Sequence, residues 1–461
     1  MLRSLILTGG LCLMTAVAGA QAPSPMPPDA EIRAMLVDRI DTRQQGVGIV
    51  VGVIGPEGRR IVSYGRLDRD DPRIPDGDTV FEIGSVTKVF TALLLAGMAR
   101  EGEVALDDPV AQHLPVGVRV PERGRAITLV DLATHTSGLP RMPANFAPRD
   151  PRDPYADYTQ AQLFDFLSGY RLPRDVGAEF EYSNLGAGLL GQALAYRAGT
   201  DYETLVRTRI VEPLGLRSTA IELPPNLQAR LAPGHDAALE TVPNWYLPTL
   251  AGAGALRSTA NDLLAFLGAV MGYDDSPLRP AMDDMLAVRR DGAKGGQVAL
   301  GWMVMPRGED ELVWHNGGTG GYRSFVGFLR KARIGVVALS NTSTEIGVDD
   351  IGFHLLDPTL PLSSPPKPHH QVAVDPALFD AYVGRYRLAP DFILTVTRDG
   401  DRLMAQATGQ ERFEIFPEGE REFFYKVVDA QITFEVDGSG RATRLVLHQG
   451  GRDQPAERIA D

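Results

Sequence analysis

The sequence predicts an α/β protein in which an antiparallel sheet flanked by helices contains an all-helical insertion, followed by a small antiparallel β-barrel. Strand-like segments lie on both sides of a largely helical stretch at about residues 106–250, an order that predicts an α/β domain with an all-helical insertion. A proline-rich linker at residues 357–370 separates this domain, residues 28–356, from residues 371–461. The last segment alternates apolar and polar residues in short runs, which predicts an independent small antiparallel barrel or sandwich, and we expect the barrel.

The composition is that of a globular protein without a nucleic-acid surface. Of the 461 residues, 23% are charged and 44% are hydrophobic, which are ordinary values. The formal net charge of −13 opposes binding to a polyanion, so no nucleic-acid partner is expected.

Residues 1–20 have the features of a secretory signal peptide. Arg3 precedes an apolar run from Leu5 to Val17, and Ala18-Gly-Ala20 fits the small-residue cleavage rule. A membrane anchor is the alternative, but the apolar run is short and a proline-rich stretch follows it, so we expect no membrane span in the mature protein. The only cysteine, Cys12, lies in this segment, which predicts a mature protein without disulfides.

The elements of the first domain are predicted from hydrophobic spacing and from capping residues. Thr159 with Gln162 fits a capping box, and Thr259 with Asp262 marks another helix start. The expected elements are a helix at 30–43, strands at 47–54 and 60–65, helices at 85–101 and 259–267, and strands at 300–305, 311–315 and 323–340, the last broken at 331–334. In the C-terminal segment we expect strands at 382–386, 393–396, 403–407, 413–416, 423–428, 432–436 and 443–448.

The first candidate catalytic pair lies in Phe81-Glu-Ile-Gly-Ser-Val-Thr-Lys88, just before an apolar helical run. If the helix begins near Ser85, Lys88 shares a helical face with the Ser85 hydroxyl and can reach it. A lysine accepts the serine proton only when burial or nearby charge lowers its pKa, and unpaired N–H groups at a helix start stabilise negative charge. Taken alone, Ser85 and Lys88 are better explained as a simple N-cap and a solvated lysine in the first helical turn than as a catalytic pair.

The second motif is Tyr182-Ser183-Asn184. A tyrosine can carry protons where a nearby cation favours its phenolate, and an asparagine side chain can both donate to and accept from a substrate amide. A turn with a half-buried tyrosine is the better explanation when this tripeptide is taken alone.

The third motif is Trp314-His-Asn-Gly-Gly-Thr-Gly-Gly-Tyr322, between two predicted strands. Its glycines let a substrate approach the backbone closely, and the N–H of Gly318 can act with that of Ser85 as an oxyanion donor. A plain glycine-rich hairpin is the alternative. The stretch lacks the helix and lysine of a phosphate-binding loop.

Together the three motifs resemble those of the penicillin-recognising serine hydrolases, which include class C β-lactamases, AmpH-type DD-peptidases and related esterases. The resemblance covers about residues 30–356 and implies a β-lactamase/transpeptidase-like fold. The C-terminal segment resembles the lipocalin-like barrels appended to some of these hydrolases, and we expect an accessory role for it. Further stretches that look like this family are Val104-Ala-Leu-Asp-Asp-Pro-Val110, Leu129-Val-Asp-Leu-Ala-Thr-His-Thr-Ser-Gly-Leu139, Pro213-Leu-Gly-Leu216 and Gly254-Ala-Leu-Arg-Ser-Thr259.

The resemblance implies that Ser85 is the acylated nucleophile and that Lys88 helps to remove its proton. Tyr182 would be a general base in acylation and a proton donor to the leaving group, and whether Lys88 or Tyr182 is the first base stays open. Asn184 would orient the acyl amide, and the backbone N–H groups of Ser85 and Gly318 would form the oxyanion hole.

The third motif departs from the β-lactamase pattern, because His315-Asn316-Gly317 stands where those enzymes have Lys-Thr-Gly. A lysine there attracts a substrate carboxylate at any physiological pH, whereas a histidine with a pKa near about 6.5 is only partly charged at about pH 7. We therefore expect His315 to bind a substrate carboxylate in a pH-dependent way and β-lactam hydrolysis to be weak. A structural role for His315 is the alternative.

The sequence thus predicts a secreted, periplasmic serine hydrolase that cleaves an amide bond through an acyl-enzyme on Ser85. Its substrate would be a small molecule or a peptide derived from peptidoglycan, that is, a β-lactam or a D-alanyl peptide. Carboxylic-ester hydrolysis is the nearer alternative, and a non-catalytic binding protein of this fold is the alternative of another class. No metal or cofactor is expected, since the remaining histidines are scattered and no His-Glu-x-x-His occurs.

Overall fold

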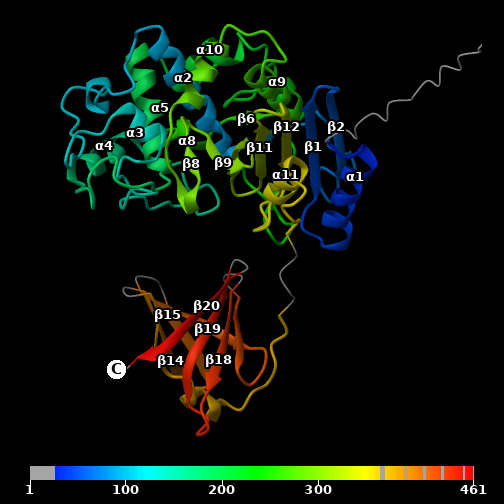
Figure 1. Ribbon diagram of the computed structural model, residues 1–461, viewed down its shortest axis with the longest axis vertical. Helices are drawn as coiled ribbons and strands as arrows, with labels where there is room; N and C mark the ends of the chain where they lie inside the picture. Colours follow the sequence, from blue (N-terminus) through cyan, green and yellow to red (C-terminus); the bar gives the residue numbers. More distant parts are fainter. Residues whose placement is uncertain are drawn as a thin grey trace, which may run out of the picture. The chain divides into compact units, whose positions relative to one another are not determined.

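The computed structural model describes residues 26–363, 369–389, 392–408, 412–426, 430–449 and 452–459. The chain divides into two compact units, with the boundary between Ser363 and Ser364. The described part of the first unit contains helices and a large sheet, and that of the second contains strands and one 3-10 helix (Figure 1). The predicted signal peptide and residues 364–368 of the predicted linker lie outside the described residues.

An antiparallel sheet of eight strands forms the centre of the first unit, in the order β2-β1-β12-β11-β10-β9-β8-β7. Two strands come from the N-terminal end and six from the end that follows the helical region, so the strands predicted on either side of that region join in one sheet. The strands are β1 (Gly48–Gly55), β2 (Gly58–Gly65), β7 (Arg290–Asp291), β8 (Gln297–Val298), β9 (Met303–Arg307), β10 (Asp310–Gly318), β11 (Arg323–Leu329) and β12 (Ile334–Ser340).

Both faces of the sheet are covered, because successive residues of its central strands pack into different cores. In β12, Val336 and Ala338 pack with the side chains of α1 (Asp29–Val37) and α11 (Asp349–Leu356). Their neighbours Val337 and Leu339 belong to the larger core on the opposite face. Figure 1 shows α1 and α11 in front of the sheet and α9 behind it.

The helical region begins directly after the first candidate catalytic motif. Thr159 accepts a hydrogen bond from the Gln162 N–H, which confirms the predicted capping box. Thr259 caps α9 in the same way. The helices are α2 (Thr87–Arg100), α3 (Leu129–Ala133), α4 (Gln160–Gly169), α5 (Asn184–Ala198), α6 (Tyr202–Val206), α7 (Pro225–Gln228), α8 (Ala251–Gly254), α9 (Ala260–Met271) and α10 (Arg279–Ala287), with the strand pairs β3 (Phe81–Glu82) to β6 (Arg257–Ser258) and β4 (Gly234–His235) to β5 (Thr241–Val242).

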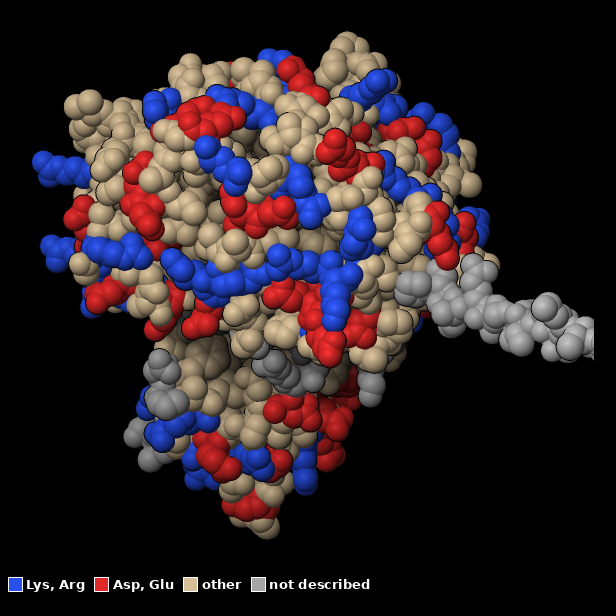
Figure 2. Space-filling model, turned by 45° about the horizontal axis from the view of Figure 1, so that its top comes forward, with Lys and Arg blue, Asp and Glu red and all other residues tan. Residues whose placement is uncertain are grey.

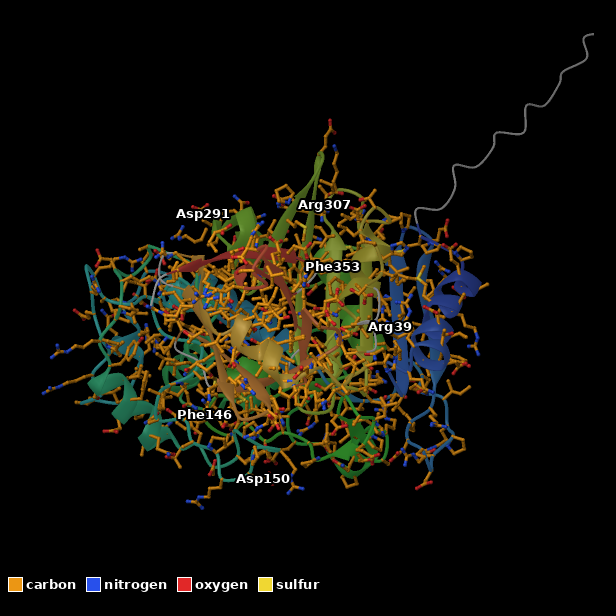
Figure 3. All side chains as sticks on the ribbon, turned by 90° about the horizontal axis from the view of Figure 1, so that it is seen from below. Arg39, Phe146, Asp150, Asp291, Arg307 and Phe353 are labelled. Carbon is orange, nitrogen blue, oxygen red and sulfur yellow. The ribbon has the colours of Figure 1, made fainter. Side chains whose placement is uncertain are left out.

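The start of α11 is fixed beside the sheet by an ion pair and an aromatic cluster. Arg39 lies just after α1 and donates to the Asp350 carboxylate at 2.5 Å and to the Gly347 carbonyl at 2.7 Å. Phe353 packs edge-on against Trp314, with their ring centroids 4.8 Å apart. Arg39 and Phe353 are labelled in Figure 3. These contacts position the residues at the N-terminal end of α11 next to β10.

The second unit is a closed barrel of eight antiparallel strands, as the predicted fold class requires. Phe379, Phe423 and Phe434 are among the side chains of its core. The eighth strand, β20, was not predicted, because Ala456 is the only fully buried side chain among those described in it. The strands are β13 (Gly384–Ala389), β14 (Phe392–Asp399), β15 (Arg402–Ala407), β16 (Arg412–Pro417), β17 (Glu422–Tyr425), β18 (Ala430–Val436), β19 (Ala442–Gln449) and β20 (Arg452–Ile459).

The surface carries charges of both signs. Figure 2 shows acidic and basic side chains interspersed over one face of the first unit. Among the described residues, no helix is both long and apolar enough to cross a membrane.

Candidate active site

Ser85 and Lys88 lie at the junction of a short 3-10 helix and α2. Ser85 is the middle residue of the 3-10 helix Gly84–Val86, and Lys88 lies in the first turn of α2. The Lys88 Nζ atom lies 2.8 Å from the Ser85 Oγ atom. Lys88 is 3% exposed, so the alternative of a solvated lysine is wrong.

The Lys88 amine also donates hydrogen bonds to two acceptors that cannot donate in return. These are the Asn184 side-chain oxygen at 2.9 Å and the Ala253 carbonyl at 2.7 Å. Burial holds the pKa of Lys88 well below its usual value, and the charge of Arg141 lowers it further. Within the described residues no carboxylate pairs with Lys88 to oppose this shift.

Tyr182 lies between charged and aromatic neighbours. The Lys88 Nζ atom is 4.9 Å and the Arg141 Cζ atom 5.2 Å from the centroid of its ring, and the His135 ring packs against it at a tilt, with centroids 4.5 Å apart. Burial raises the pKa of Tyr182 to about 12, although Ser85 and Arg141 act in the opposite direction. The phenol is therefore protonated at neutral pH, and the nearby cations do not produce the phenolate considered for this motif.

The second motif forms the start of α5. Ser183 caps this helix by accepting from the Gly186 N–H at 2.8 Å, and its hydroxyl donates to the Pro140 carbonyl. Asn184 follows as the first helical residue, and its amide nitrogen donates to the Tyr155 hydroxyl at 3.3 Å. This local structure turns the Asn184 side chain toward Lys88.

Two glycines, Gly84 and Gly317, allow the third motif to approach the nucleophile. A Cβ atom on Gly84, which has φ +48°, would lie 2.7 Å from the Gly318 nitrogen. A Cβ atom on Gly317 would lie 2.0 Å from the Ile83 carbonyl oxygen and 2.9 Å from the Ser85 nitrogen. The end of β10 therefore contacts the 3-10 helix. This contact brings the backbones of Ser85 and Gly318 close together.

His315 does not match the expectation of a partly charged, substrate-facing histidine. It is 1% exposed, and strand alternation directs Trp314 and Asn316, its neighbours in β10, into the cleft instead. Its Nδ1 donates to the Asn316 carbonyl at 2.6 Å, whereas its Nε2 is buried and has no partner among the described residues. Burial lowers the pKa of His315 to about 3, so the ring is neutral at physiological pH and cannot attract a carboxylate by charge.

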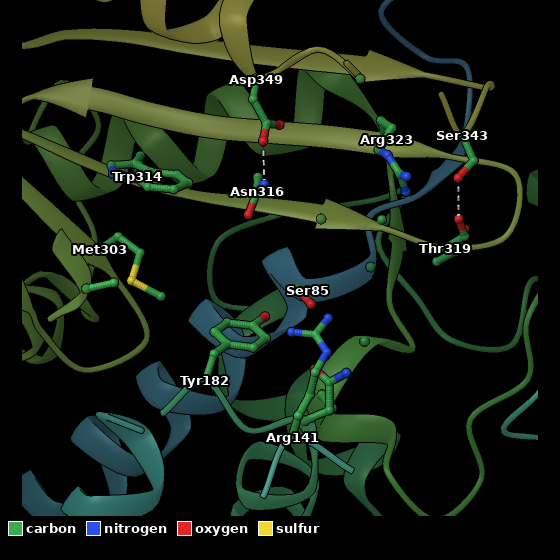
Figure 4. A pocket seen from close by; sticks show the side chains of 18 of the residues that line it. Ser85, Arg141, Tyr182, Met303, Trp314, Asn316, Thr319, Arg323, Ser343 and Asp349 are labelled. Carbon is green, nitrogen blue, oxygen red and sulfur yellow. Dashed lines mark hydrogen bonds between the residues drawn. The ribbon is translucent and has the colours of Figure 1, made fainter. Parts of the chain in front are cut away.

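The cleft in front of Ser85 has a volume of about 1100 Å³. Figure 4 shows Ser85 between Tyr182 and Arg141 on the helical side and the strands that carry Asn316 and Arg323 on the other. Aromatic side chains line much of the cleft, and they include Tyr155, Phe180, Trp245 and Trp314.

Four residues of or beside this cleft were not singled out from the sequence, namely His135, Arg141, Arg323 and Asp349. Of the four, only His135 could have been found from the sequence, because it lies in the stretch at residues 129–139 that resembles the family. The other three come from separate segments that only the folded chain brings together. In the part of the chain that the structure describes, no group of three His, Cys, Asp or Glu residues could hold a metal ion.

An antiparallel sheet with a helical insertion, and a serine paired with a buried lysine at their junction, define a serine hydrolase. The chain belongs to the β-lactamase family, whose family model matches residues 33–358. A second family model, described as a domain of unknown function (DUF3471), matches residues 368–458. These findings confirm the family to which the sequence motifs were assigned.

Named relatives cover most of the chain. The D-alanyl-D-alanine-carboxypeptidase/endopeptidase AmpH of Escherichia coli (strain K12) is 29% identical over 360 residues, which are 74% of this chain and 92% of the relative. Penicillin-binding protein 4* of Bacillus subtilis (strain 168) is 27% identical over 450 residues, or 92% of this chain and 97% of the relative. A crystal structure of a β-lactamase/D-alanine carboxypeptidase from Yersinia pestis in complex with citrate is similar with a TM-score of 0.60 and 25% identity, covering 69% of this chain and 93% of that one.

Proposed function

We propose that this serine hydrolase forms an acyl-enzyme on Ser85 and cleaves an amide bond in a D-alanyl peptide or a β-lactam. The observation that carries the proposal is the contact between the Lys88 amine and the Ser85 hydroxyl, in a setting that lowers the pKa of Lys88. The named relatives support this substrate class, since they include a D-alanyl-D-alanine carboxypeptidase and a penicillin-binding protein.

Lys88 is the first base in this proposal. A neutral amine has two N–H bonds and one lone pair, and the carbonyl oxygens of Asn184 and Ala253 can only accept. They therefore take the two N–H bonds and leave the lone pair for the hydroxyl proton of Ser85. Ser85 Oγ attacks the carbonyl carbon of the substrate as its proton moves to Lys88, and the N–H groups of Ser85 and Gly318 stabilise the oxyanion.

Tyr182 is the proton donor to the leaving group. With a pKa of about 12 it is protonated when substrate binds, and an amine must gain a proton as the amide bond breaks. Tyr182 gives that proton and recovers one from the Lys88 ammonium, which restores the neutral amine. Water then attacks the acyl carbon and gives a proton to the neutral Lys88 amine, and this proton passes to the Ser85 oxygen as the bond between that oxygen and the acyl carbon breaks. An ester needs this donor less, so a protonated tyrosine at this place matters most when the substrate is an amide.

The proposed location is the periplasm, supported by the signal-peptide features of residues 1–20. Export of the chain from a Gram-negative host, followed by determination of the N-terminal sequence, should give a mature protein that begins at Gln21. A mature chain that still begins at Met1 would contradict it.

Intact-protein mass spectrometry tests the acyl-enzyme. Wild type mixed with a penicillin should gain one drug mass within minutes, and the Ser85→Ala variant should gain none while keeping its thermal unfolding temperature. A persistent adduct supports the peptidase, and a rapidly decaying one supports the β-lactamase. Absence of both adduct and drug consumption would contradict the proposal and favour the esterase.

A further inference from the structure

Tyr182, the proposed proton donor, lies in an irregular segment just before α5. Residues 180–183 belong to no helix or strand, so no repeating pattern of hydrogen bonds fixes the Tyr182 side chain. Its hydroxyl must nevertheless come within hydrogen-bond distance of the leaving group of a substrate bound at Ser85. Contacts with the rest of the chain therefore have to hold this segment in place.

His135 forms hydrogen bonds to the residues on both sides of Tyr182. The Glu181 N–H donates to the His135 carbonyl at 2.8 Å, and the Ser183 N–H donates to the His135 Nδ1 at 3.2 Å. The His135 ring also packs against the Tyr182 ring, and it meets the Phe180 ring edge-on with centroids 5.8 Å apart. One residue thus contacts four consecutive residues of the segment.

The His135 backbone has a conformation that residues with a side chain usually avoid. His135 follows Thr134, the C-cap residue of α3, and has φ +58°. Glycine is the usual residue at this place after a helix, because it adopts a positive φ without a steric penalty. Backbone strain of this kind beside a reactive group is a reason to look for a function of the side chain. In this conformation both the carbonyl and the ring of His135 bind the segment that contains Tyr182.

The Nδ1 atom of His135 can accept the Ser183 N–H only while the ring is neutral. Burial holds the pKa of His135 well below its usual value, and positive charge on Lys88 or Arg141 lowers it further. The ring is therefore neutral at physiological pH, with its proton on Nε2. His135 takes no proton during the reaction, so any effect of His135 on proton transfer acts through Tyr182.

Neighbouring residues of the same loop hold the start of α5 instead. The Ser183 hydroxyl donates to the Pro140 carbonyl at 2.7 Å, and the Asn184 N–H donates to the Arg141 carbonyl at 3.0 Å. These contacts act on the helix that follows Tyr182, whereas the two hydrogen bonds of His135 enclose Tyr182 itself.

We propose that His135 is a positioning residue that holds the Tyr182 hydroxyl in place for proton transfer to the leaving group. The proposal rests on the proposed function, because it uses the same proton donor. Loss of His135 should therefore slow a reaction most when the leaving group needs a proton.

The test compares two esters of the same N-acetyl-D-alanyl group, one with p-nitrophenol and one with ethanol as the leaving group. p-Nitrophenol leaves as a stable anion, whereas ethoxide is strongly basic and needs a proton as the bond breaks. The measured quantity is the ratio of kcat/KM for the ethyl ester to that for the p-nitrophenyl ester, which does not depend on the fraction of folded enzyme. An enzyme that cleaves these esters and no amide would contradict the proposed amide substrate, and the ratio would still test His135.

Tyr182→Phe should lower this ratio about 100-fold, because general acid catalysis contributes at least this much. His135→Gly suits the positive φ but lacks the ring, and it should lower the ratio about tenfold by misplacing the donor. His135→Asn tolerates a positive φ and keeps an acceptor for the Ser183 N–H, so it should lose only about threefold. The control His113→Asn removes a ring that contacts Asp108 and should leave the ratio unchanged.

The decisive comparison combines His135→Gly with Tyr182→Phe. No hydroxyl is then left to position, so the double variant should have the same ratio as Tyr182→Phe within about twofold. If His135→Gly does not fold, His135→Asn takes its place, alone and combined with Tyr182→Phe.

Two results would overturn the inference. One is a His135 variant that slows both esters by the same factor, because that pattern assigns His135 a general structural role. The other is a His135 variant that lowers the ratio equally with and without the Tyr182 hydroxyl. A Tyr182→Phe variant with the wild-type ratio would contradict the proton-donor role in the proposed function, and the inference would fall with it.

Discussion

Asp349 is the acidic side chain of the cleft whose charge changes near neutral pH. Burial raises its pKa to about 6, while the Asn316 amide and the Arg323 charge act in the opposite direction. The nearby Asp350, which raises it further, is paired with Arg39. Asp349 is therefore neutral below about pH 6 and negative above it.

This titration predicts a pH-dependent preference for carboxylate substrates. Above about pH 6 the Asp349 charge repels a substrate carboxylate in the cleft, and below about pH 6 the repulsion disappears. For a substrate with a free carboxylate on its leaving group and the matching carboxamide, the ratio of their kcat/KM values should rise about fivefold as pH falls from about 7.5 to about 5, which corresponds to about 1 kcal/mol of charge repulsion. The ratio removes the effect of Lys88 protonation, which acts on both substrates alike.

Asp349→Asn should make this ratio independent of pH, whereas His315→Asn should leave its pH dependence in place, since His315 is already neutral across this range. If the ratio loses its pH dependence in His315→Asn and keeps it in Asp349→Asn, then His315 and not Asp349 causes that dependence.

Sequence reasoning at the residue scale succeeded where partners are close in the chain. Ser85 and Lys88 are three residues apart, and helix geometry alone brings them into contact. The rest of β11, the whole of β12 and a loop lie between Arg323 and Asp349, and no local pattern predicts that the two residues meet. The charge of His315 was predicted wrongly, because the ordinary pKa of histidine applies in water and this ring is buried.

At the scale of elements, the approach of β10 to the 3-10 helix depends on a position that tolerates no side chain. Gly317→Ala places a Cβ atom 2.0 Å from the Ile83 carbonyl oxygen, so the strand must move away from Ser85. Overpacking of this kind costs about 1–3 kcal/mol of stability. We expect acylation by a penicillin to slow at least about 100-fold, measured by the mass-spectrometric time course.

The matched control is Gly55→Ala, at the end of β1, where an added Cβ atom meets nothing within 4 Å. It should acylate at the wild-type rate. Equal acylation rates for Gly317→Ala and wild type would show that the close approach is unnecessary for reaction.

Elements with caps or long alternating runs were predictable, whereas the last strand of the barrel was not. Thr159 and Thr259 marked helix starts because their side chains satisfy N–H groups that the helix leaves unpaired. Strand β20 contains Pro455 and mostly exposed residues, so its sequence lacks a buried face. It forms because β13 and β19 offer their edges on both sides.

At the scale of the whole molecule, the two units have separate cores, which predicts separate unfolding transitions. Phe434 is 1% exposed in the barrel core, where it stacks on Tyr382. Phe434→Ala should lower the free energy of unfolding of the barrel by about 3–5 kcal/mol and leave the other transition unchanged in calorimetry. Acylation by a penicillin should shift only the transition of the first unit.

A single transition that moves as a whole with either change would contradict this independence. The division itself was visible in the sequence, because proline-rich composition and a change of hydrophobic period coincide near residue 360.

The positions of the tryptophans allow events in the cleft to be followed by fluorescence. The chain has three tryptophans, and two of them, Trp245 and Trp314, line the cleft, while Trp302 is fully buried in the core of the same unit. The barrel sequence has none. Tryptophan emission, excited where tyrosine does not absorb, therefore reports on the first unit alone, and a ligand entering the cleft changes the polarity around two of its three tryptophans. Stopped-flow emission can follow binding and acylation in real time without any attached dye.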